Sequence, residues 1–280
     1  MKNRRYQENS LAVPTTASLV LAAGRGSRMK GYEGNKTLLP LIPEGGPYTG
    51  TRPILLEILG NLPSGPKGVV VHHHKEAVMA ATRGMGISYW EQPVLNGTGG
   101  ALLAARPFLE NQNFDHLLVT MGDVPLVRPE TYLGLVQKLD HDHVTLLGFR
   151  TESKKRYGLL VTEGEQVKRI IEWEYWHRLP SAQQDRLQIC NSGIYAFRKA
   201  ILHQALSVLA STPHEVPKTI HGEVCRVKEY FITDLIQYLH ESGHKVGYLV
   251  TERPEEVMGV DDPQALKRAQ EIFRNYPLHT

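Results

Sequence analysis

Short runs of apolar residues recur through the first half of the chain, and segments with helical spacing of apolar positions separate them. Unbroken runs of this length are typical of strands buried on both faces, as in a parallel sheet. The predicted strands are Ser18–Leu21, Gly68–Val71, His116–Met121 and Val144–Leu147, and the predicted helices are Ile54–Leu59, Gly99–Ala105 and Thr131–Leu139. This alternation predicts an α/β fold with a doubly wound, mostly parallel, Rossmann-like sheet.

The pattern changes from Tyr157 onward, where shorter strand-like pieces and loops precede a predicted helix over about Tyr230–Ser242. We therefore expect residues 1–15 to form an N-terminal tail and residues 16–280 to form one domain. Within this domain we expect a first half of residues 16–155, a smaller lobe of residues 156–262 and a closing helix of residues 263–276. The Pro- and Gly-rich stretch Ile42–Pro53 predicts a surface loop.

Composition narrows the class of protein. The chain has 280 residues, 41% of them hydrophobic and 22% charged, as in an ordinary globular protein. A net charge of +3 gives no reason to expect a nucleic acid or a membrane as partner. The apolar run near the start is too short for a signal peptide, so we expect a cytoplasmic location. Cys190 and Cys225 stand in strand-like contexts, and we expect two buried thiols.

The first predicted strand leads into a turn of small residues, and two cations follow it. The turn comprises Leu21, Ala22, Ala23, Gly24 and Gly26, and the cations are Arg28 and Lys36. Small side chains let several backbone N–H groups point into one space, where an anion can bind. Ligands of such sheets bind at the carboxyl ends of the strands. The segment therefore predicts a cradle for nucleotide phosphates, although its spacing matches neither G-x-G-x-x-G nor the P-loop.

Two further segments carry candidate chemistry. The amide of Gln92 offers both a donor and an acceptor, which suits the Watson–Crick edge of a pyrimidine such as uracil. Gly97 would let a base approach the backbone, and Thr98 is the expected N-cap of the next helix. A later buried strand ends in Gly122-Asp123, which places a carboxylate at the carboxyl edge of the sheet. Because Mg²⁺ prefers carboxylate and phosphate oxygens, Asp123 is a candidate metal ligand.

These motifs, in this order, resemble the sugar-1-phosphate nucleotidyltransferases. The resemblance rests on L-A-A-G-R-G-S-R-M from Leu21, Lys36, L-L-P-L from Leu38, Q-P-V-L-N-G-T from Gln92, G-D-V-P-L from Gly122, R-Y-G-L from Arg156, I-I-E from Ile170, N-S-G-I from Asn191, E-Y-F-I-T-D from Glu229 and G-V-D from Gly259. It covers about residues 18–274 and is strongest to the uridyltransferase half of the bacterial bifunctional N-acetylglucosamine-1-phosphate enzyme.

The resemblance implies the nucleotide-diphospho-sugar transferase fold. It also implies Mg²⁺-dependent transfer of a nucleotidyl group from a nucleoside triphosphate, UTP, to a sugar-1-phosphate, for which N-acetylglucosamine-1-phosphate is a candidate. The implied catalytic residues are Arg28, Lys36 and Asp123, and the implied metal ligands are Asp123 and Asp261. The implied nucleotide-binding residues are Leu21, Ala22, Ala23, Gly24, Gly26, Arg28, Lys36, Gln92, Gly97, Thr98, Met121 and Gly122; the implied sugar-binding residues are Gly158, Glu172, Asn191 and Thr233.

The chain departs from the family pattern at Glu174, where a lysine is usual. Either Glu174 points away from the acceptor, or the acceptor differs. The neighbouring Tyr175 and Trp176 are core residues or a wall that selects a different sugar.

Other interpretations stay open. A molybdenum-cofactor cytidylyltransferase shares the opening motif, and a non-catalytic nucleotide-sugar-binding protein would also explain Glu174. The motifs do not separate UTP from dTTP or define the oligomeric state. The sequence ends before any hexapeptide repeat, so we do not expect acetyltransferase activity. The run His72-His73-His74 follows a strand, and because successive strand residues point to alternate faces, we do not expect it to bind a metal.

Overall fold

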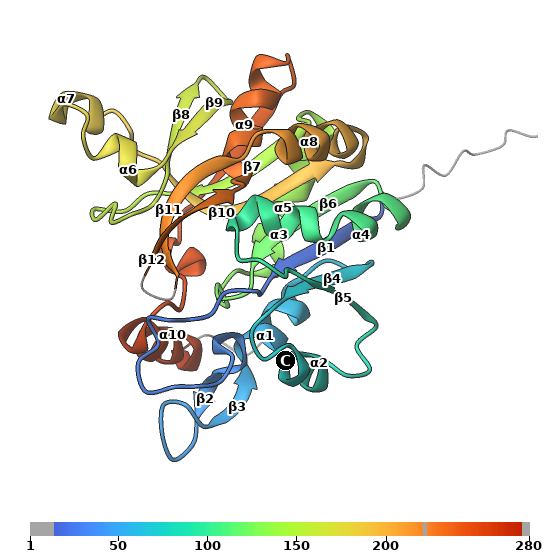
Figure 1. Ribbon diagram of the computed structural model, residues 1–280, viewed down its shortest axis with the longest axis vertical. Coiled ribbons are helices and arrows are strands. Elements are labelled where there is room, and N and C mark those ends of the chain that lie inside the picture. The colour runs from blue at the N-terminus through green and yellow to red at the C-terminus, as the bar shows by residue number, and fades with distance from the viewer. Residues whose placement is uncertain (1–13, 221–222, 276–280) are drawn as a thin grey trace, which may run out of the picture.

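The computed structural model describes residues 14–220 and 223–275. Among these residues, nine strands form one sheet in the order β5-β4-β1-β6-β10-β7-β13-β9-β8 (Figure 1). In chain order these strands are β1 (Thr16–Leu21), β4 (Lys67–Val71), β5 (Ile87–Glu91), β6 (His116–Met121), β7 (Val144–Phe149), β8 (Leu159–Glu163), β9 (Gln166–Ile171), β10 (Cys190–Arg198) and β13 (Val246–Thr251). The four predicted strands correspond to β1, β4, β6 and β7.

Strands β1, β4, β5 and β6 of the first half pair in parallel, as predicted. Strand β1 lies between β4 and β6, β4 pairs with β5, and β7 pairs with β13, all in parallel. Strand β10 instead runs antiparallel between β6 and β7, and β8 and β9 form an antiparallel pair at the far edge. Two residues separate β8 from β9, and a connection this short permits only an antiparallel hairpin. The α/β fold is confirmed, with a mixed rather than a mostly parallel second half.

Helices cover the two faces of the sheet because strand side chains alternate between two apolar clusters. Val20 belongs to one cluster, and its neighbours Leu19 and Leu21 belong to the other. Helices α1 (Ile54–Asn61), α2 (Lys75–Ala81), α5 (Pro129–Gln137) and α10 (Pro263–Asn275) contribute to the first cluster; α3 (Gly97–Ala104), α4 (Arg106–Asn111), α8 (Lys199–Ser211) and α9 (Ile232–Glu241) contribute to the second. Shorter helical segments are η1 (Lys36–Leu38), η2 (Lys138–Asp140), α6 (Trp173–Trp176), α7 (Ser181–Gln184) and η3 (Pro254–Val257).

The stretch expected to be a surface loop is partly a hairpin, so that prediction is wrong at both of its ends. Strands β2 (Pro40–Pro43) and β3 (Gly50–Pro53) pair antiparallel beside α10 (Figure 1). Gln270 of α10 donates from its side-chain amide to the carbonyl oxygens of Pro40 at 2.8 Å and Pro47 at 2.9 Å. A buried amide from the last helix therefore fixes the hairpin.

A second hairpin, β11 (His214–Ile220) and β12 (Glu223–Glu229), stands apart from the main sheet. Cys225 lies on this hairpin and is exposed, so the prediction of a buried thiol is wrong there. Cys190 in β10 is buried as predicted, and burial raises its pKa to about 11. Both cysteines are free thiols.

The five predicted helices are present with bounds that differ by a few residues, and the prediction for Pro263–Tyr276 is confirmed as far as Asn275. Most of the predicted tail, residues 1–15, and Tyr276 lie outside the described residues. The division of the chain near residue 155 stays a prediction, although one sheet contains strands from both sides of it. No helix within residues 14–220 and 223–275 is long and apolar enough to cross a membrane.

Candidate active site

The turn after β1 leaves a series of backbone N–H groups free. Ala22 donates to the carbonyl of Val70, and Gly122 donates to the carbonyl of Leu21, each at 2.9 Å, so both amides belong to the extended sheet. The N–H groups of residues 23 to 28, in contrast, donate to no backbone carbonyl of the described chain. Unpaired amides at a strand end bind anions. The backbone amides that could bind phosphate in the predicted cradle are therefore those of residues 23–28.

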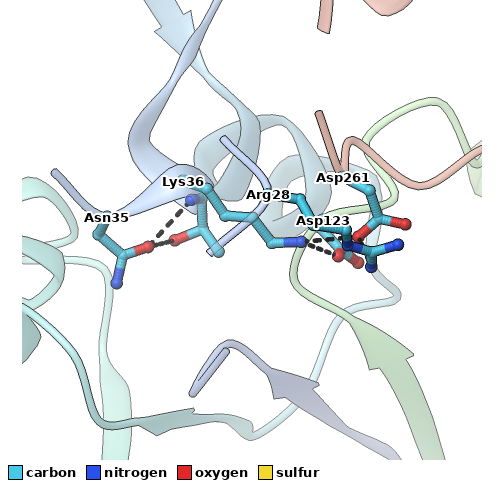
Figure 2. Close-up of polar contacts among 6 residues, drawn as sticks. Arg28, Asn35, Lys36, Asp123 and Asp261 are labelled. Atoms are coloured by element: carbon cyan, nitrogen blue, oxygen red, sulfur yellow. Dashed lines mark hydrogen bonds and ion pairs between the residues drawn. The ribbon is translucent and has the colours of Figure 1, made fainter. Parts of the chain in front are cut away.

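Lys36 is held against this turn by two local features. Gly26 has a φ of +64° and a Cβ there would lie 3.2 Å from the Cβ of Lys36, a combination that requires glycine. Asn35 precedes η1 and accepts the N–H of Thr37 on its Oδ1 at 2.9 Å, while its Nδ2 donates to the carbonyl of His73 at 2.7 Å. The side chain of Lys36 is thereby directed across the carboxyl edge of the sheet (Figure 2).

Four charged side chains from three distant segments meet at that edge (Figure 2). The Nζ of Lys36 contacts Asp123 and lies 3.2 Å from the Oδ1 of Asp261. The same oxygen of Asp261 accepts a hydrogen bond from the Nη2 of Arg28 at 2.8 Å. The structure thus brings together the three predicted catalytic residues and both predicted metal ligands, with two positive and two negative charges in contact.

The loop that carries Asp261 is fixed on both sides. On one side, the N–H of Val260 donates to the carbonyl of Asp123 at 2.8 Å. On the other, Asp262 accepts the N–H of Ala265 on its Oδ1 at 2.8 Å and so caps α10, which begins at Pro263 as predicted. Asp261 is therefore positioned by the backbone around it as well as by its ion pairs.

The two cations differ in their surroundings. The side chain of Lys36 is 9% exposed, whereas that of Arg28 is 71% exposed. Burial by itself lowers the pKa of Lys36, but the charges and hydrogen bonds of Asp123 and Asp261 outweigh this effect and raise its pKa above the usual value. Lys36 is therefore always positively charged at neutral pH, while Arg28 can exchange its ion-pair partner at little cost in free energy.

The two carboxylates fit a magnesium ion. Asp123 and Asp261 both contact the ammonium group of Lys36, so their oxygens already converge on the position of one cation. Mg²⁺ is commonly held by one or two carboxylates together with substrate phosphates. In the described chain no group of three or more His, Cys, Asp or Glu side chains could hold a metal. A magnesium ion here would therefore need phosphate oxygens or water as further ligands.

Two adjoining cavities surround these charges. The smaller, of about 410 Å³, lies over the glycine turn and the charged residues. The larger, of about 1060 Å³, is lined by all four predicted sugar-binding residues, Gly158, Glu172, Asn191 and Thr233, and is called the acceptor cavity after their predicted role. Met121, Tyr157 and Ser192 line both cavities, so the two cavities meet at these residues.

The predicted sugar-binding groups are held by neighbours within the larger cavity. Asn191 donates its Nδ2 to the hydroxyl of Tyr195 at 2.7 Å and receives the N–H of Gly193 on its Oδ1 at 3.2 Å. Burial raises the pKa of Glu172, a hydrogen bond with Thr233 lowers it, and the charges of Glu174 and Asp234 raise it further. Glu174 does not point away from the acceptor cavity, because it is one of the lining residues.

The predicted base-reading segment is connected to the acceptor side. Gln92 is buried and donates its amide to the Oδ1 of Asn96 at 2.9 Å and the carbonyl of Gly97 at 3.1 Å. Gly97 has a φ of +91°, and a Cβ there would lie 2.4 Å from the carbonyl oxygen of Tyr230. The role of this segment with a base stays a prediction.

Thr98 is not the N-cap of α3, which begins one residue earlier, at Gly97. The hydroxyl of Thr98 instead accepts the N–H of Ile232 at 3.4 Å, where α9 begins. Thr98 also lines the acceptor cavity, so it lies between the two predicted binding segments. The N-cap prediction for Thr98 is wrong because its hydroxyl bonds to Ile232, which is distant in sequence. Capping rules consider only residues that are neighbours in sequence.

The three consecutive histidines hold different segments in place. His72 contacts the carbonyl of Gln92 through its Nδ1 at 2.8 Å, and His74 contacts the carbonyl of Glu33 through its Nε2 at 2.8 Å. The backbone carbonyl of His73 accepts the amide of Asn35. Sequence reasoning missed Asn35, although an Asn two residues before a Thr is a recognisable turn signal.

The shared lining residues Tyr157 and Ser192 were also missed, even though they lie within the predicted sugar-binding motifs. Tyr157 packs edge-to-face on Phe149, with ring centroids 4.8 Å apart, and burial raises its pKa. No local signal distinguishes such a wall residue from an ordinary core aromatic.

Free amides, paired cations and paired carboxylates at the carboxyl edge of an α/β sheet are the arrangement expected of an enzyme that transfers part of a nucleoside triphosphate. The chain belongs to the family of the MobA-like NTP transferase domain, whose model matches residues 18–209. Thr233 and Asp261 lie beyond the matched residues.

Among curated proteins, the chain is similar to the bifunctional protein GlmU of Syntrophotalea carbinolica, with 32% identity over 262 residues, covering 92% of this chain and 51% of that protein. It is also similar to GlmU of Alcanivorax borkumensis, with 30% identity, covering 94% of this chain and 53% of that protein. The chain thus spans about half the length of these relatives. The resemblance stated from the motifs is confirmed.

A solved structure with the same fold is the uridine diphosphate N-acetylglucosamine pyrophosphorylase of Trypanosoma brucei. Its TM-score is 0.68 at 12% sequence identity, and the match covers 91% of this chain and 65% of that one. The nucleotide-diphospho-sugar transferase fold implied by the motifs is therefore confirmed.

Proposed function

We propose that this chain transfers the nucleotidyl group of UTP to a sugar-1-phosphate, giving a nucleotide-sugar and pyrophosphate. An oxygen of the acceptor phosphate forms a bond to the α-phosphorus of the triphosphate. The bond between the α-phosphorus and the oxygen bridging to the β-phosphate breaks, and its electron pair leaves with pyrophosphate. Because the attacking oxygen is already an anion, the step needs no strong base. Its main barrier is the approach of two anions, which preorganised positive groups reduce.

The observation that carries this proposal is the meeting of Arg28, Lys36, Asp123 and Asp261 beside two adjoining cavities. In this proposal the free amides of residues 23–28 receive the phosphate oxygens. Lys36 neutralises the α-phosphate region, because it is nearly buried and permanently charged. Arg28 is exposed, so its guanidinium is placed to bind the leaving pyrophosphate.

Asp123 and Asp261 would hold Mg²⁺ in this proposal. A magnesium ion supplies a Lewis acid that offsets the negative charge of the phosphates. The ammonium of Lys36, which contacts both carboxylates, must yield part of that space and move toward the phosphates. The contact of one cation with both carboxylates supports a single metal position.

The larger cavity would take the acceptor, with Gly158, Glu172, Asn191 and Thr233 toward the sugar. N-acetylglucosamine-1-phosphate is the acceptor suggested by the sequence motifs and by the name of the similar solved structure, a uridine diphosphate N-acetylglucosamine pyrophosphorylase. The side-chain amide nitrogen of Gln92 is bound within the protein, so its carbonyl oxygen is left to accept a base N–H group, such as the N3–H of uracil.

The matched family also keeps cytidylyl transfer open, since its description names an NTP transferase without naming the nucleotide. A binding protein without turnover is the second alternative. Complete charge pairing around Lys36 favours catalysis over mere binding, because a binder needs no second carboxylate at the phosphate site.

The test is a matrix of nucleoside triphosphates against sugar-1-phosphates with Mg²⁺, scored by pyrophosphate release and by the mass of the product. We expect a nucleotide-sugar with UTP as the preferred donor. Turnover with CTP alone would support the cytidylyltransferase, and binding without pyrophosphate release in every combination would contradict the proposal.

A further inference from the structure

The acceptor cavity carries an excess of negative charge. Its lining contains five carboxylates against two guanidinium groups and one imidazole: Glu172, Glu174, Glu215, Glu229 and Asp234 against Arg156, Arg169 and His214. With His214 neutral, carboxylates of the lining outnumber its guanidinium groups by three, although Glu215 is paired with the Nη1 of Arg226 at 3.1 Å. For a cavity that is proposed to receive a phosphate ester, this excess has the same sign as the phosphate and would oppose its binding.

Two of these carboxylates, Glu172 and Glu174, form no ion pair with any residue that the structure describes. Asp234 is paired with the Nε2 of His214 at 2.8 Å, so its charge is at least partly met. Glu174 makes no hydrogen bond or ion pair with any other described residue, and it acts on Glu172 strongly enough to contribute to its raised pKa. Glu172 is partly buried and Glu174 is exposed. Two neighbouring carboxylates without a cation create a position where a cation is stabilised.

The two arginines that line the cavity form no ion pair with Glu172 or Glu174 in the described chain. The guanidinium of Arg156 stacks over the ring of Trp173, 4.5 Å from its centroid. Next to Glu174, Tyr175 also lines the cavity and is 64% exposed, which is unusual for a large aromatic side chain. An exposed aromatic ring beside a carboxylate pair suits a positively charged nitrogen, since the ring face attracts cations.

We infer that the acceptor is a phosphate ester that also carries a protonated amino group, and that Glu172 and Glu174 bind this group. The inference rests on the proposed function, and it selects among its acceptors. Glu174 then determines specificity by charge: its carboxylate favours a free amine over the neutral amide or hydroxyl at the same position. The phosphate of the same ester lies toward the wall shared with the nucleotide cavity, away from the carboxylate pair.

The test compares three sugars that differ at one carbon: glucosamine-1-phosphate, N-acetylglucosamine-1-phosphate and glucose-1-phosphate. Phosphoethanolamine is the fourth probe, which separates an amino sugar from a non-sugar amine. We expect kcat/KM for glucosamine-1-phosphate to exceed that for the acetylated sugar about tenfold, the effect of one charge-assisted contact. A preference for phosphoethanolamine over all three sugars would support recognition of an amino group and would show that the acceptor is not a sugar. Equal or better turnover of the neutral sugars would overturn the inference and leave the proposed function intact.

Variants of Glu174 separate charge from shape. Glu174→Gln should lower the ratio of amine to neutral acceptor about tenfold, and Glu174→Lys should reverse it. The matched control is Glu165→Gln, an exposed carboxylate on the turn between β8 and β9, which should keep the wild-type ratio. An unchanged ratio in Glu174→Gln would show that this carboxylate does not recognise the acceptor.

Calorimetry of the same esters, without nucleotide, decides the inference even if no acceptor is turned over. In that case the absence of pyrophosphate would contradict the proposed function. Tighter binding of glucosamine-1-phosphate than of its acetylated form, lost in Glu174→Gln, would still support the amine. Equal binding of the two esters would contradict it.

Discussion

The two cavities of this molecule treat charge in opposite ways. Around Lys36, two cations contact two carboxylates and the net charge is zero. In the acceptor cavity, carboxylates outnumber cations, and Glu174 has no partner in the described chain. In the charged cluster, a bound ligand must replace ion pairs that already exist. An unpaired carboxylate, in contrast, gains a new ion pair when a cationic ligand binds. On the proposed function, the first cavity would exchange ion-pair partners when the ligand binds, and the second would select its ligand by the sign of its charge.

The comparison also separates buried from exposed charge. The side chain of Lys36 is almost inaccessible, so removing one of its partners leaves a charge without solvent to compensate it. Glu174 is exposed, and water can screen it until a ligand displaces that water. Substitutions in the charged cluster should therefore have larger effects than substitutions in the acceptor cavity.

The largest expected effect is that of Asp123→Ala. This change removes one of two carboxylates from the position proposed for Mg²⁺ and leaves the ammonium of Lys36 with Asp261 alone. We expect pyrophosphate release to fall about a hundredfold or more, the size of losing one preorganised electrostatic contact. Near-normal turnover, measured with saturating Mg²⁺, would contradict the assignment of Asp123. Asp115→Ala, which changes a carboxylate at the opposite end of β6, is the control.

The second prediction tests whether Lys36 competes with a metal ion. In Lys36→Met the carboxylates of Asp123 and Asp261 lose the cation between them, so they should bind a divalent ion more tightly. We expect about tenfold tighter binding of Mn²⁺ without nucleotide, since two carboxylates near one site favour a cation by at least that factor. The measurement is titration calorimetry with Mn²⁺.

The control for Lys36→Met is Lys30→Met, which removes an exposed lysine of the same loop and should leave the affinity for Mn²⁺ unchanged. Addition of Mn²⁺ should also raise the Tm of Lys36→Met more than that of the wild type. If both variants bind the ion as the wild type does, the ammonium does not occupy the metal position.

The sequence predicted the framework of the nucleotide side well, because its signals are local. Unbroken apolar runs identify β1 and β6 since both faces of these strands are covered by helices. The strands β8 and β9 are only partly buried, so their apolar pattern is weak. The β2–β3 hairpin was missed because Pro and Gly dominate its composition, and because Gln270, which fixes it, is more than 200 residues away in sequence.

The candidate site shows the same difference between features set by local sequence and features set by distant residues. Arg28, Lys36 and Asp123 lie in segments whose motifs are read from a few consecutive residues. Thr98 was misassigned because the helix that it caps, α9, begins 134 residues later. The balance of positive and negative side chains in the acceptor cavity depends on residues from several hairpins and helices. These segments are far apart in sequence, so no single motif predicts which charges meet there.

The third prediction concerns the support of Asp261. In Asp262→Ala, α10 loses the side chain that accepts the N–H of Ala265, which costs about 1 kcal/mol of stability. Because Asp261 precedes this cap, we expect the affinity for Mg²⁺ with nucleotide to fall about fivefold, a free-energy change of similar size. The control is Asp262→Asn, which retains a capping oxygen and should keep both values. Loss of affinity in Asp262→Asn as well would assign the effect to charge instead of to the cap.

The smallest expected effect is that of Glu172→Gln, and it tests the acceptor cavity through pH. Burial, together with Glu174 and Asp234, raises the pKa of Glu172 in the folded chain. Its contribution to stability is therefore complete below the pKa of the unfolded chain and is lost as the pH rises through the raised folded value. Glu172→Gln does not lose stability in this way. Its Tm should therefore equal that of the wild type in acid and exceed it at neutral pH. We expect a gain within about 0.5 kcal/mol, read by calorimetry from pH 4 to 8. Saturating glucosamine-1-phosphate should abolish the gain, because its amine stabilises the ionised Glu172 of the wild type; a gain that persists with this ligand bound would show that the amine lies elsewhere.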